Sequence, residues 1–197
     1  MSAVNEWIVR EYFESLGFLT SQPHKYVAIG RHREADEEFD LLVVNPRAQV
    51  LVIPTHQIWT GQDLTEVKRA IIAVRGWHSG RFSVATFENS PELLRIVDPD
   101  VLQAAGQRMG PGPVAKILCL PKLPASGELK KETIAVLKSK GIDGVLPFQT
   151  ILQELIQSID ANQHYEKSDL LQLLRMLKSY DLIRDSQLEL FSKRPRE

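Results

Sequence analysis

The chain has 197 residues, of which 43% are hydrophobic and 25% are charged, and its formal net charge is −1. This length suits one domain, or one domain with a small appendage, and the composition excludes collagen, a coiled coil and wholesale disorder. Because the charge is near neutral, binding to nucleic acid or to anionic lipid would need a local basic patch.

Cysteine use and the start of the chain indicate a cytoplasmic protein. The one cysteine, Cys119, excludes an intrachain disulfide framework and a cysteine-rich zinc site. Glu6 stands where a signal peptide would need apolar residues. The aliphatic runs fall far short of the roughly 20 residues of a membrane helix, so we expect no membrane partner.

In the N-terminal half, apolar residues at helical spacing predict a helix over residues 4–16, which Gly17 ends. Strands are expected next, the stronger two forming a hairpin around the turn Asn45-Pro46. The four expected strands are 18–20, 26–29, 39–44 and 50–53. A second helix over 63–77 and a strand over 81–87 follow.

In the C-terminal half, strands alternate with helices, which indicates parallel pairing through helical crossovers. The expected elements are a strand at 115–120, a helix at 128–140, a strand at 145–146 and a helix at 148–159. A last amphipathic helix begins near Ser168, a residue type favoured at the N-cap, and carries four leucines at helical spacing.

The first half of the chain resembles the restriction-endonuclease-like superfamily, PD-(D/E)XK. A helix precedes the segment 37–44, in which the acidic residues Glu37, Glu38 and Asp40 lead into the aliphatic part of the expected strand 39–44, and a second strand is expected next. The resemblance implies an α/β fold with a mixed sheet flanked by helices, extended by strand–helix units and a C-terminal helix. We accordingly divide the chain into an endonuclease-like domain at 1–160 and a C-terminal helical segment at 164–191.

In that family, the site consists of a glutamate on the first helix, an aspartate at the start of one strand, and Glu-x-Lys on the next strand. Glu6 matches the helix carboxylate and lies about 50° from the mean direction of Val9, Phe13 and Leu16, at the edge of the buried face. Asp40 matches the aspartate. The resemblance therefore implies that Asp40 and Glu6 bind Mg²⁺ or Mn²⁺ and take part in catalysis.

The Glu-x-Lys motif is altered in this chain. On the expected strand, Pro54 replaces the glutamate and His56 replaces the lysine, which makes His56 the candidate proton carrier. Because side chains alternate along a strand, either Pro54 with His56 or Thr55 with Gln57 faces the site. We favour His56 and keep Gln57 as the reserve.

A literal Glu-x-Lys occurs at Glu66-Val67-Lys68, but it falls in the expected second helix. Helical positions two apart point about 200° away from each other, so the two side chains would not converge on one metal ion. A single acid or base from this helix, Glu66 or Arg69, is left as an open alternative.

Five basic residues are candidates for contact with nucleic acid, since phosphates attract cations and bases stack on nearby aromatic rings. These are Arg31, Arg33, Arg75, His78 and Arg81.

We therefore expect a protein that engages DNA, either cutting it with Mg²⁺ or Mn²⁺ or binding without cutting. Impaired catalysis is favoured, because two signature positions of the family are altered. The alternative is a scaffold that keeps only the fold and forms a homodimer or a partner contact through its C-terminal helix. A Rossmann-like sensor is a more distant idea, because the loop at 106–113 precedes a strand, whereas a phosphate-binding loop should open a helix.

Overall fold

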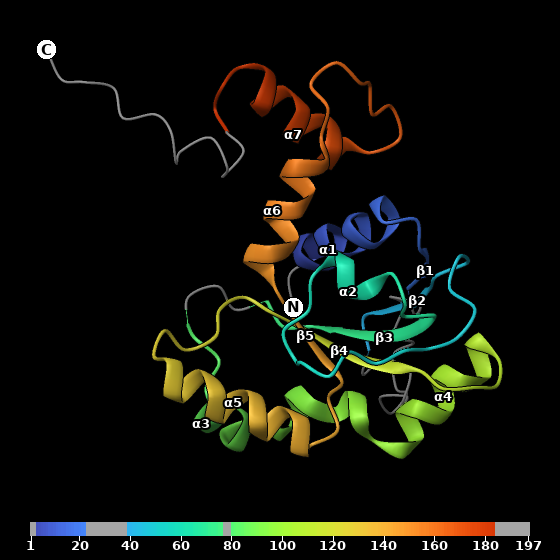
Figure 1. The fold of residues 1–197 in the computed structure, drawn as a ribbon, viewed down its shortest axis with the longest axis vertical. Helices are drawn as coiled ribbons and strands as arrows, with labels where there is room; N and C mark the ends of the chain where they lie inside the picture. The colour runs from blue at the N-terminus through green and yellow to red at the C-terminus, as the bar shows by residue number, and fades with distance from the viewer. Residues whose placement is uncertain (1–2, 23–38, 77–79, 184–197) are drawn as a thin grey trace, which may run out of the picture.

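The computed structural model describes residues 3–22, 39–76 and 80–183, and a mixed β-sheet forms its centre (Figure 1). The five strands lie side by side in chain order. Strands β1, β2 and β3 pair antiparallel, whereas β4 joins β3 and β5 joins β4 in parallel. The strands are β1 (Leu19–Ser21), β2 (Leu41–Val44), β3 (Arg69–Val74), β4 (Ala115–Leu120) and β5 (Gly144–Pro147). The predicted α/β class is confirmed.

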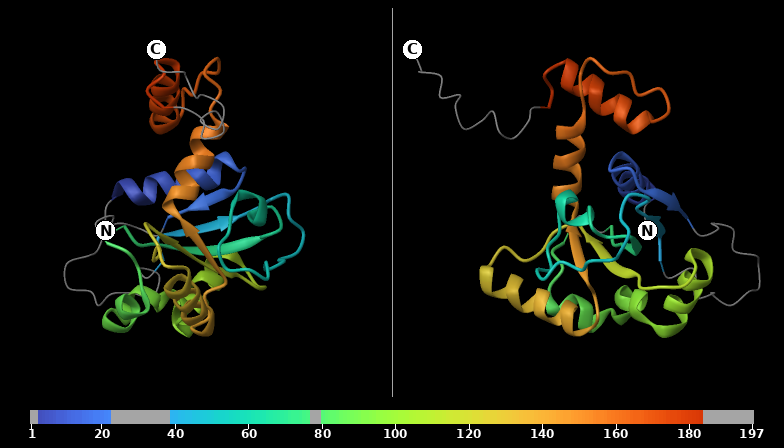
Figure 2. Two further views of the ribbon diagram at one scale, coloured as in Figure 1. Left: turned by 60° about the vertical axis from the view of Figure 1, so that its left-hand side comes forward. Right: turned by 45° about the vertical axis from the view of Figure 1, so that its right-hand side comes forward.

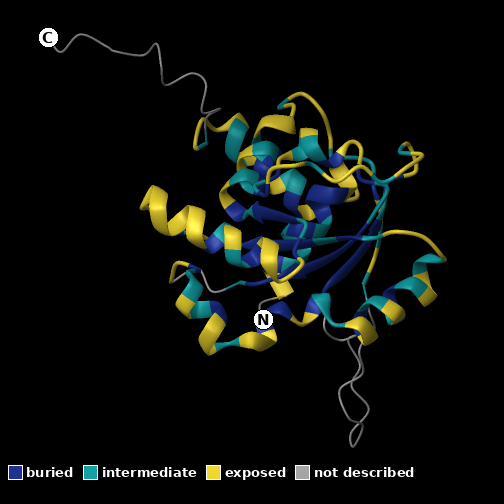
Figure 3. Cartoon of the chain, turned by 60° about the horizontal axis from the view of Figure 1, so that its bottom comes forward, coloured by how far each residue is buried: buried dark blue, intermediate teal, exposed yellow. Residues whose placement is uncertain are grey.

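Helices cover both faces of the sheet (Figures 1 and 3). One face packs against the crossovers between the parallel strands, and the other packs against the first helix and the helix after β5. The crossover helices are α3 (Val84–Asn89), the 3-10 helix η2 (Pro91–Val97), α4 (Pro99–Met109) and α5 (Gly127–Ser139). The opposite layer contains α1 (Ala3–Ser15), the short α2 (Gly61–Leu64) and α6 (Phe148–Ser158).

Because side chains alternate along β3, this strand contributes residues to both hydrophobic layers. Ile72 and Val74 join the layer under α1, whereas Ile71 and Ala73 join the layer over η2 and α4. All four are buried, because helices cover both faces of this strand. A strand of this kind has a continuous apolar sequence without polar alternation.

Helix α1 ends where its sequence predicts. Gly17 adopts a φ of 88°, and the Phe18 amide donates to the Phe13 carbonyl at 3.0 Å, which is the hydrogen bond of a Schellman cap. Val9, Tyr12 and Phe13 are buried against the sheet. The helix is therefore fixed at both its apolar face and its C-terminus.

Helix α7 (Asp169–Ser179) packs on α1, at a distance from the sheet. Figure 2 shows α6 rising from the end of β5 and carrying α7 above α1. The expected N-cap is confirmed, since the Ser168 Oγ accepts from the Leu171 amide at 3.2 Å and also donates to Glu11 at 2.6 Å. Leu170 and Leu174 complete the same apolar cluster as Val9.

Three predicted elements are wrong. Residues 50–53 form no strand, and residues 69–74, expected within a helix, form β3 as the antiparallel partner of β2. The buried run 70–74 has apolar residues at every position, so it also satisfied helical spacing. The strand expected at 81–87 is replaced by α3, which Ser83 caps with Thr86. The strand expected at 26–29 lies outside the described residues.

The other predicted helices and strands are confirmed within a residue or two. Across the ranges 3–22, 39–76 and 80–183, none of the helices combines the length and apolar character that crossing a membrane requires.

Candidate functional site

Asp40 immediately precedes β2 and is 7% exposed. Because β2 runs antiparallel to β3, the start of β2 lies beside the end of β3. There the Asp40 Oδ2 accepts from the Val74 amide at 2.6 Å and from the Arg75 Nη1 at 3.2 Å. The aspartate is thus held in a buried, hydrogen-bonded ion pair at the edge of the sheet.

Arg75 is 6% exposed, and the protein surrounds its guanidinium. Its Nε donates to the Leu93 carbonyl at 3.1 Å, while its backbone amide donates to the Cys119 carbonyl at 2.9 Å. A phosphate contact would need this side chain at the surface. The structure corrects that prediction, because Arg75 is directed to Asp40 and to a buried carbonyl.

The start of α1 lies beside this ion pair. The Asn5 amide group donates to the Gly76 carbonyl at 3.2 Å, and a side-chain carbon at Gly76 would overlap the Asn5 amide. Glu6, the next residue, is half-buried, and its charge acts on Asp40. Two of the three predicted site residues, Glu6 and Asp40, are therefore close enough to influence each other electrostatically.

Burial raises the pKa of Asp40 to about 6. The loss of hydration is the largest effect, and the negative charge of Glu6 adds to it. The positive charge of Arg75 and the hydrogen bond from Val74 act in the opposite direction without outweighing desolvation. Asp40 consequently titrates much closer to neutrality than an exposed aspartate does.

The third predicted residue, His56, lies in a different setting. Its Nε2 is 3.0 Å from the Asp63 Oδ1, and its side chain is 57% exposed. Burial opposes ionisation of Asp63, but hydrogen bonds from Thr60 and His56 lower the pKa of this aspartate. Asp63 also accepts the Thr60 amide at 2.8 Å, so His56 belongs to the N-terminal cap of α2.

The reserve candidate, Gln57, is buried, and its backbone is paired with β5. Its carbonyl accepts the Val145 amide at 2.7 Å. The alternatives Glu66 and Arg69 also lie away from Asp40, because Arg69 begins β3 and Asp40 lies beside the end of that strand. The Arg69 Nη1 donates to the carbonyls of Met109 and Gly110 at 3.1 Å.

The described residues around Asp40 do not form the oxygen-rich site that a divalent cation prefers. Such a cation prefers several carboxylate or carbonyl oxygens, whereas the register of β2 and β3, continued by one residue, places Ala73 opposite Asp40, and the Arg75 guanidinium lies 3.2 Å from its carboxylate. A metal ion at this carboxylate would be repelled by that guanidinium. In the described part of the chain, no three His, Cys, Asp or Glu side chains form a group that could hold a metal ion.

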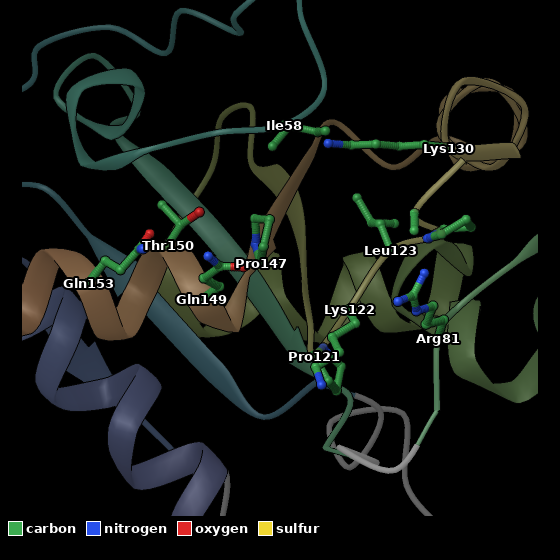
Figure 4. Close-up of a pocket in the computed structure, with 12 residues that line it drawn as sticks. Ile58, Arg81, Pro121, Lys122, Leu123, Lys130, Pro147, Gln149, Thr150 and Gln153 are labelled. Atoms are coloured by element: carbon green, nitrogen blue, oxygen red, sulfur yellow. The ribbon is translucent and has the colours of Figure 1, made fainter. Parts of the chain in front are cut away.

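A pocket of about 520 Å³ opens along the same edge of the sheet, beyond the ends of β4 and β5 (Figure 4). The carboxyl ends of parallel strands are where α/β proteins place their ligands. Among the described lining residues, three are cations, namely Arg81, Lys122 and Lys130, and none is acidic. The pocket therefore suits an anion.

Arg81 is the one nucleic-acid candidate that the structure places at this pocket. Arg31, Arg33 and His78 lie outside the described residues. Lys122 and Lys130 are not among the five basic candidates that the sequence predicted. The available signal was position, because Lys122 follows the end of a parallel strand almost directly.

No protein-family model matches this chain, and no match is found among curated proteins or solved structures.

Proposed function

We propose that the chain is a cytoplasmic protein of the restriction-endonuclease-like class that binds nucleic acid without metal-dependent cleavage. Two features support the class: α1 precedes the strands of the sheet, and Asp40 opens a strand whose antiparallel neighbour is the next strand along the chain. The resemblance requires a Glu-x-Lys on that next strand. With β3 in this position, the corresponding residues are Ala73, Val74 and Arg75.

This assignment of the Glu-x-Lys positions to 73–75 replaces the predicted assignment to Pro54 and His56. Ala73 supplies no carboxylate, and Arg75 keeps the positive charge of the lysine but is paired with Asp40 at 3.2 Å. Arginine does not give up its proton near neutral pH, so Arg75 is a poor general acid or base.

The observation that carries the non-cleaving function is the buried Asp40–Arg75 pair. Removing either member would leave an uncompensated charge at the edge of the sheet, so each side chain is needed where the other is present. Among the described residues, a carboxylate with this structural role, facing an alanine, has fewer oxygen partners than metal-dependent hydrolysis uses.

The cations beyond β4 and β5 support nucleic acid as the partner. Because the whole chain is nearly neutral, affinity for a phosphate backbone must come from a local cluster of this kind. Arg81 and Lys122 are exposed on the same edge of the sheet as Asp40.

Two measurements on the full chain test the proposal. Fluorescence anisotropy with labelled duplex and single-stranded DNA should give an affinity that falls steeply as salt increases. Lys122→Glu should weaken it at least tenfold, whereas Lys138→Glu, on α5 away from the pocket, should have little effect. Supercoiled plasmid incubated with Mg²⁺ or Mn²⁺ should stay intact.

Nicking by the wild type that disappears in Asp40→Asn would show an active nuclease and overturn the non-cleaving function. An absence of salt-dependent binding would overturn the nucleic-acid function.

The scaffold function is the second candidate, and the outer face of α7 favours it. Leu173, Met176 and Tyr180 share one helical face and are 51%, 47% and 72% exposed. Sedimentation that gives a dimer, combined with no DNA binding, would support this candidate.

A further inference from the structure

The pocket beyond β4 and β5 has walls that the fold holds in place. The Phe82 amide donates to the Lys122 carbonyl at 2.8 Å, which positions Arg81 beside the segment after β4. On the far wall, Ile58 pairs with Val145 of β5 in an isolated bridge. These backbone contacts involve four separate segments of the chain that surround one cavity (Figure 4).

The cations of the pocket are not neutralised by the protein. Within the described ranges, the side chains of Arg81, Lys122 and Lys130 make no ion pair or hydrogen bond, and the pocket lining contains no carboxylate. Three positive charges around one cavity repel each other. A bound anion with several oxygens would attract all three and offset that repulsion.

Neutral hydrogen-bond donors and the N-terminus of α6 add to the positive potential in the pocket. Helix α6 begins directly after β5, and its first turn places Gln149 and Thr150 on the pocket wall. The dipole of a helix is positive at its N-terminus and favours a negatively charged group there. The cations and the helix terminus act from different walls on the same space.

The pocket is also larger than a phosphate ion requires. Its volume of about 520 Å³ lies within the range of small-molecule sites. Ile58, Leu123 and Pro147 give apolar surface that an organic group can cover.

We propose that this pocket binds a phosphate monoester, with the phosphate at Arg81, Lys122 and Lys130 and the organic part against the apolar wall. The proposal goes beyond the proposed function, because it rests on the pocket alone and holds whether or not the chain binds polynucleotides along the sheet edge. The monoester has two possible sources, a free mononucleotide or the terminal phosphate of a strand.

Isothermal titration calorimetry on the full chain tests the proposal with thymidine 5′-monophosphate, thymidine and inorganic phosphate. We expect the monophosphate to bind at least tenfold more tightly than thymidine. Lys122→Ala and Arg81→Ala should each weaken that binding at least fivefold, while thermal unfolding shows that both variants fold. Lys138→Ala, the matched control on α5, should bind as the wild type does.

A second arm separates the sources by comparing a 5′-phosphorylated oligonucleotide with the same oligonucleotide ending in a 5′-hydroxyl. A preference for the phosphorylated end identifies the strand end, whereas binding of the monophosphate without that preference identifies a free nucleotide. Both results support the pocket.

The proposal is overturned if phosphate improves the binding of neither thymidine nor the oligonucleotide, or if Lys122→Ala and Arg81→Ala leave binding unchanged. Salt-dependent DNA binding without any effect of a terminal phosphate would overturn the pocket proposal and leave the proposed function standing.

Discussion

The Tyr12 hydroxyl donates a 2.6 Å hydrogen bond to the Glu154 Oε2, although the two residues are 142 positions apart. The same oxygen accepts the Gly61 amide at 2.9 Å, so one carboxylate joins α1, α6 and the start of α2. Burial raises the pKa of Tyr12, and the adjacent Glu154 raises it further, which keeps the phenol protonated and able to donate.

Tyr12→Phe removes this donor and leaves Glu154 with fewer partners. A hydrogen bond to a charged group contributes roughly 1.5–3 kcal/mol, so we expect a loss of that size in the free energy of unfolding, measured by urea denaturation. Tyr180→Phe is the matched control, because Tyr180 is 72% exposed, and it should change stability very little. Equal stability of the two variants would contradict a structural role for the Tyr12 hydroxyl.

Asp40 should make the stability of the protein depend on pH. Its pKa of about 6 in the folded chain exceeds its ordinary value of 3.8, so the folded state binds this proton more tightly than the unfolded chain. This contribution to stability is complete below pH 4 and is lost as the pH rises through 6.

Relative to Asp40→Asn, which does not titrate, the free energy of unfolding of the wild type should fall by roughly 2–3 kcal/mol between pH 4 and pH 7. Denaturant titrations of both proteins across this range measure it. Parallel pH profiles would refute the assignment of a titrating group to Asp40.

Arg75→Met removes the guanidinium and leaves the Asp40 carboxylate buried without its ion-pair partner. Breaking one side of a buried pair costs about 3–5 kcal/mol, and we expect that loss at pH 8, where Asp40 is ionised. The double variant Asp40→Asn/Arg75→Met should recover a large part of it. If the loss of stability in the double variant equals the sum of the losses in the two single variants, Asp40 and Arg75 are not energetically coupled.

Gly144→Ala places a methyl group against the indole ring of Trp59, which is fully buried beside β5. Overpacking of a core costs roughly 1–3 kcal/mol, and the melting temperature should fall accordingly. Gly106→Ala is the contrasting variant, since nothing lies within 4 Å of a side-chain carbon at this position in α4. It should leave stability unchanged or raise it by up to about 1 kcal/mol. If Gly106→Ala lowered the melting temperature more than Gly144→Ala did, the close packing of Trp59 against Gly144 would be refuted.

Much of the fold could be predicted from the sequence where local signals and burial agree. Helix α1 has one apolar face and a glycine stop, and β4 and β5 alternate with helices that carry clear apolar faces. Strand β3 could not be predicted, because a strand buried on both faces has no alternation, and its apolar residues also fit a helix.

Because residues 69–74 were expected in a helix, the third residue of the candidate site was assigned to another segment. Asp40 was found because it precedes an aliphatic strand, but its neighbour across the sheet depends on which later segment pairs with β2. Assigning that role to 50–53 selected His56, whereas the pairing with 69–74 selects Arg75. The charge of Lys122 was visible in the sequence, but its position beside Arg81 depends on the tertiary structure.

The contact between α1 and α7 also has a consequence for biosynthesis. Val9 and Phe13 share one apolar cluster with Leu170 and Leu174, which are translated much later. During translation, the part of this cluster that α7 covers stays open until residue 174 has left the ribosome, and contacts between such distant residues form slowly. Until then, the growing chain exposes a hydrophobic surface of the kind that chaperones recognise.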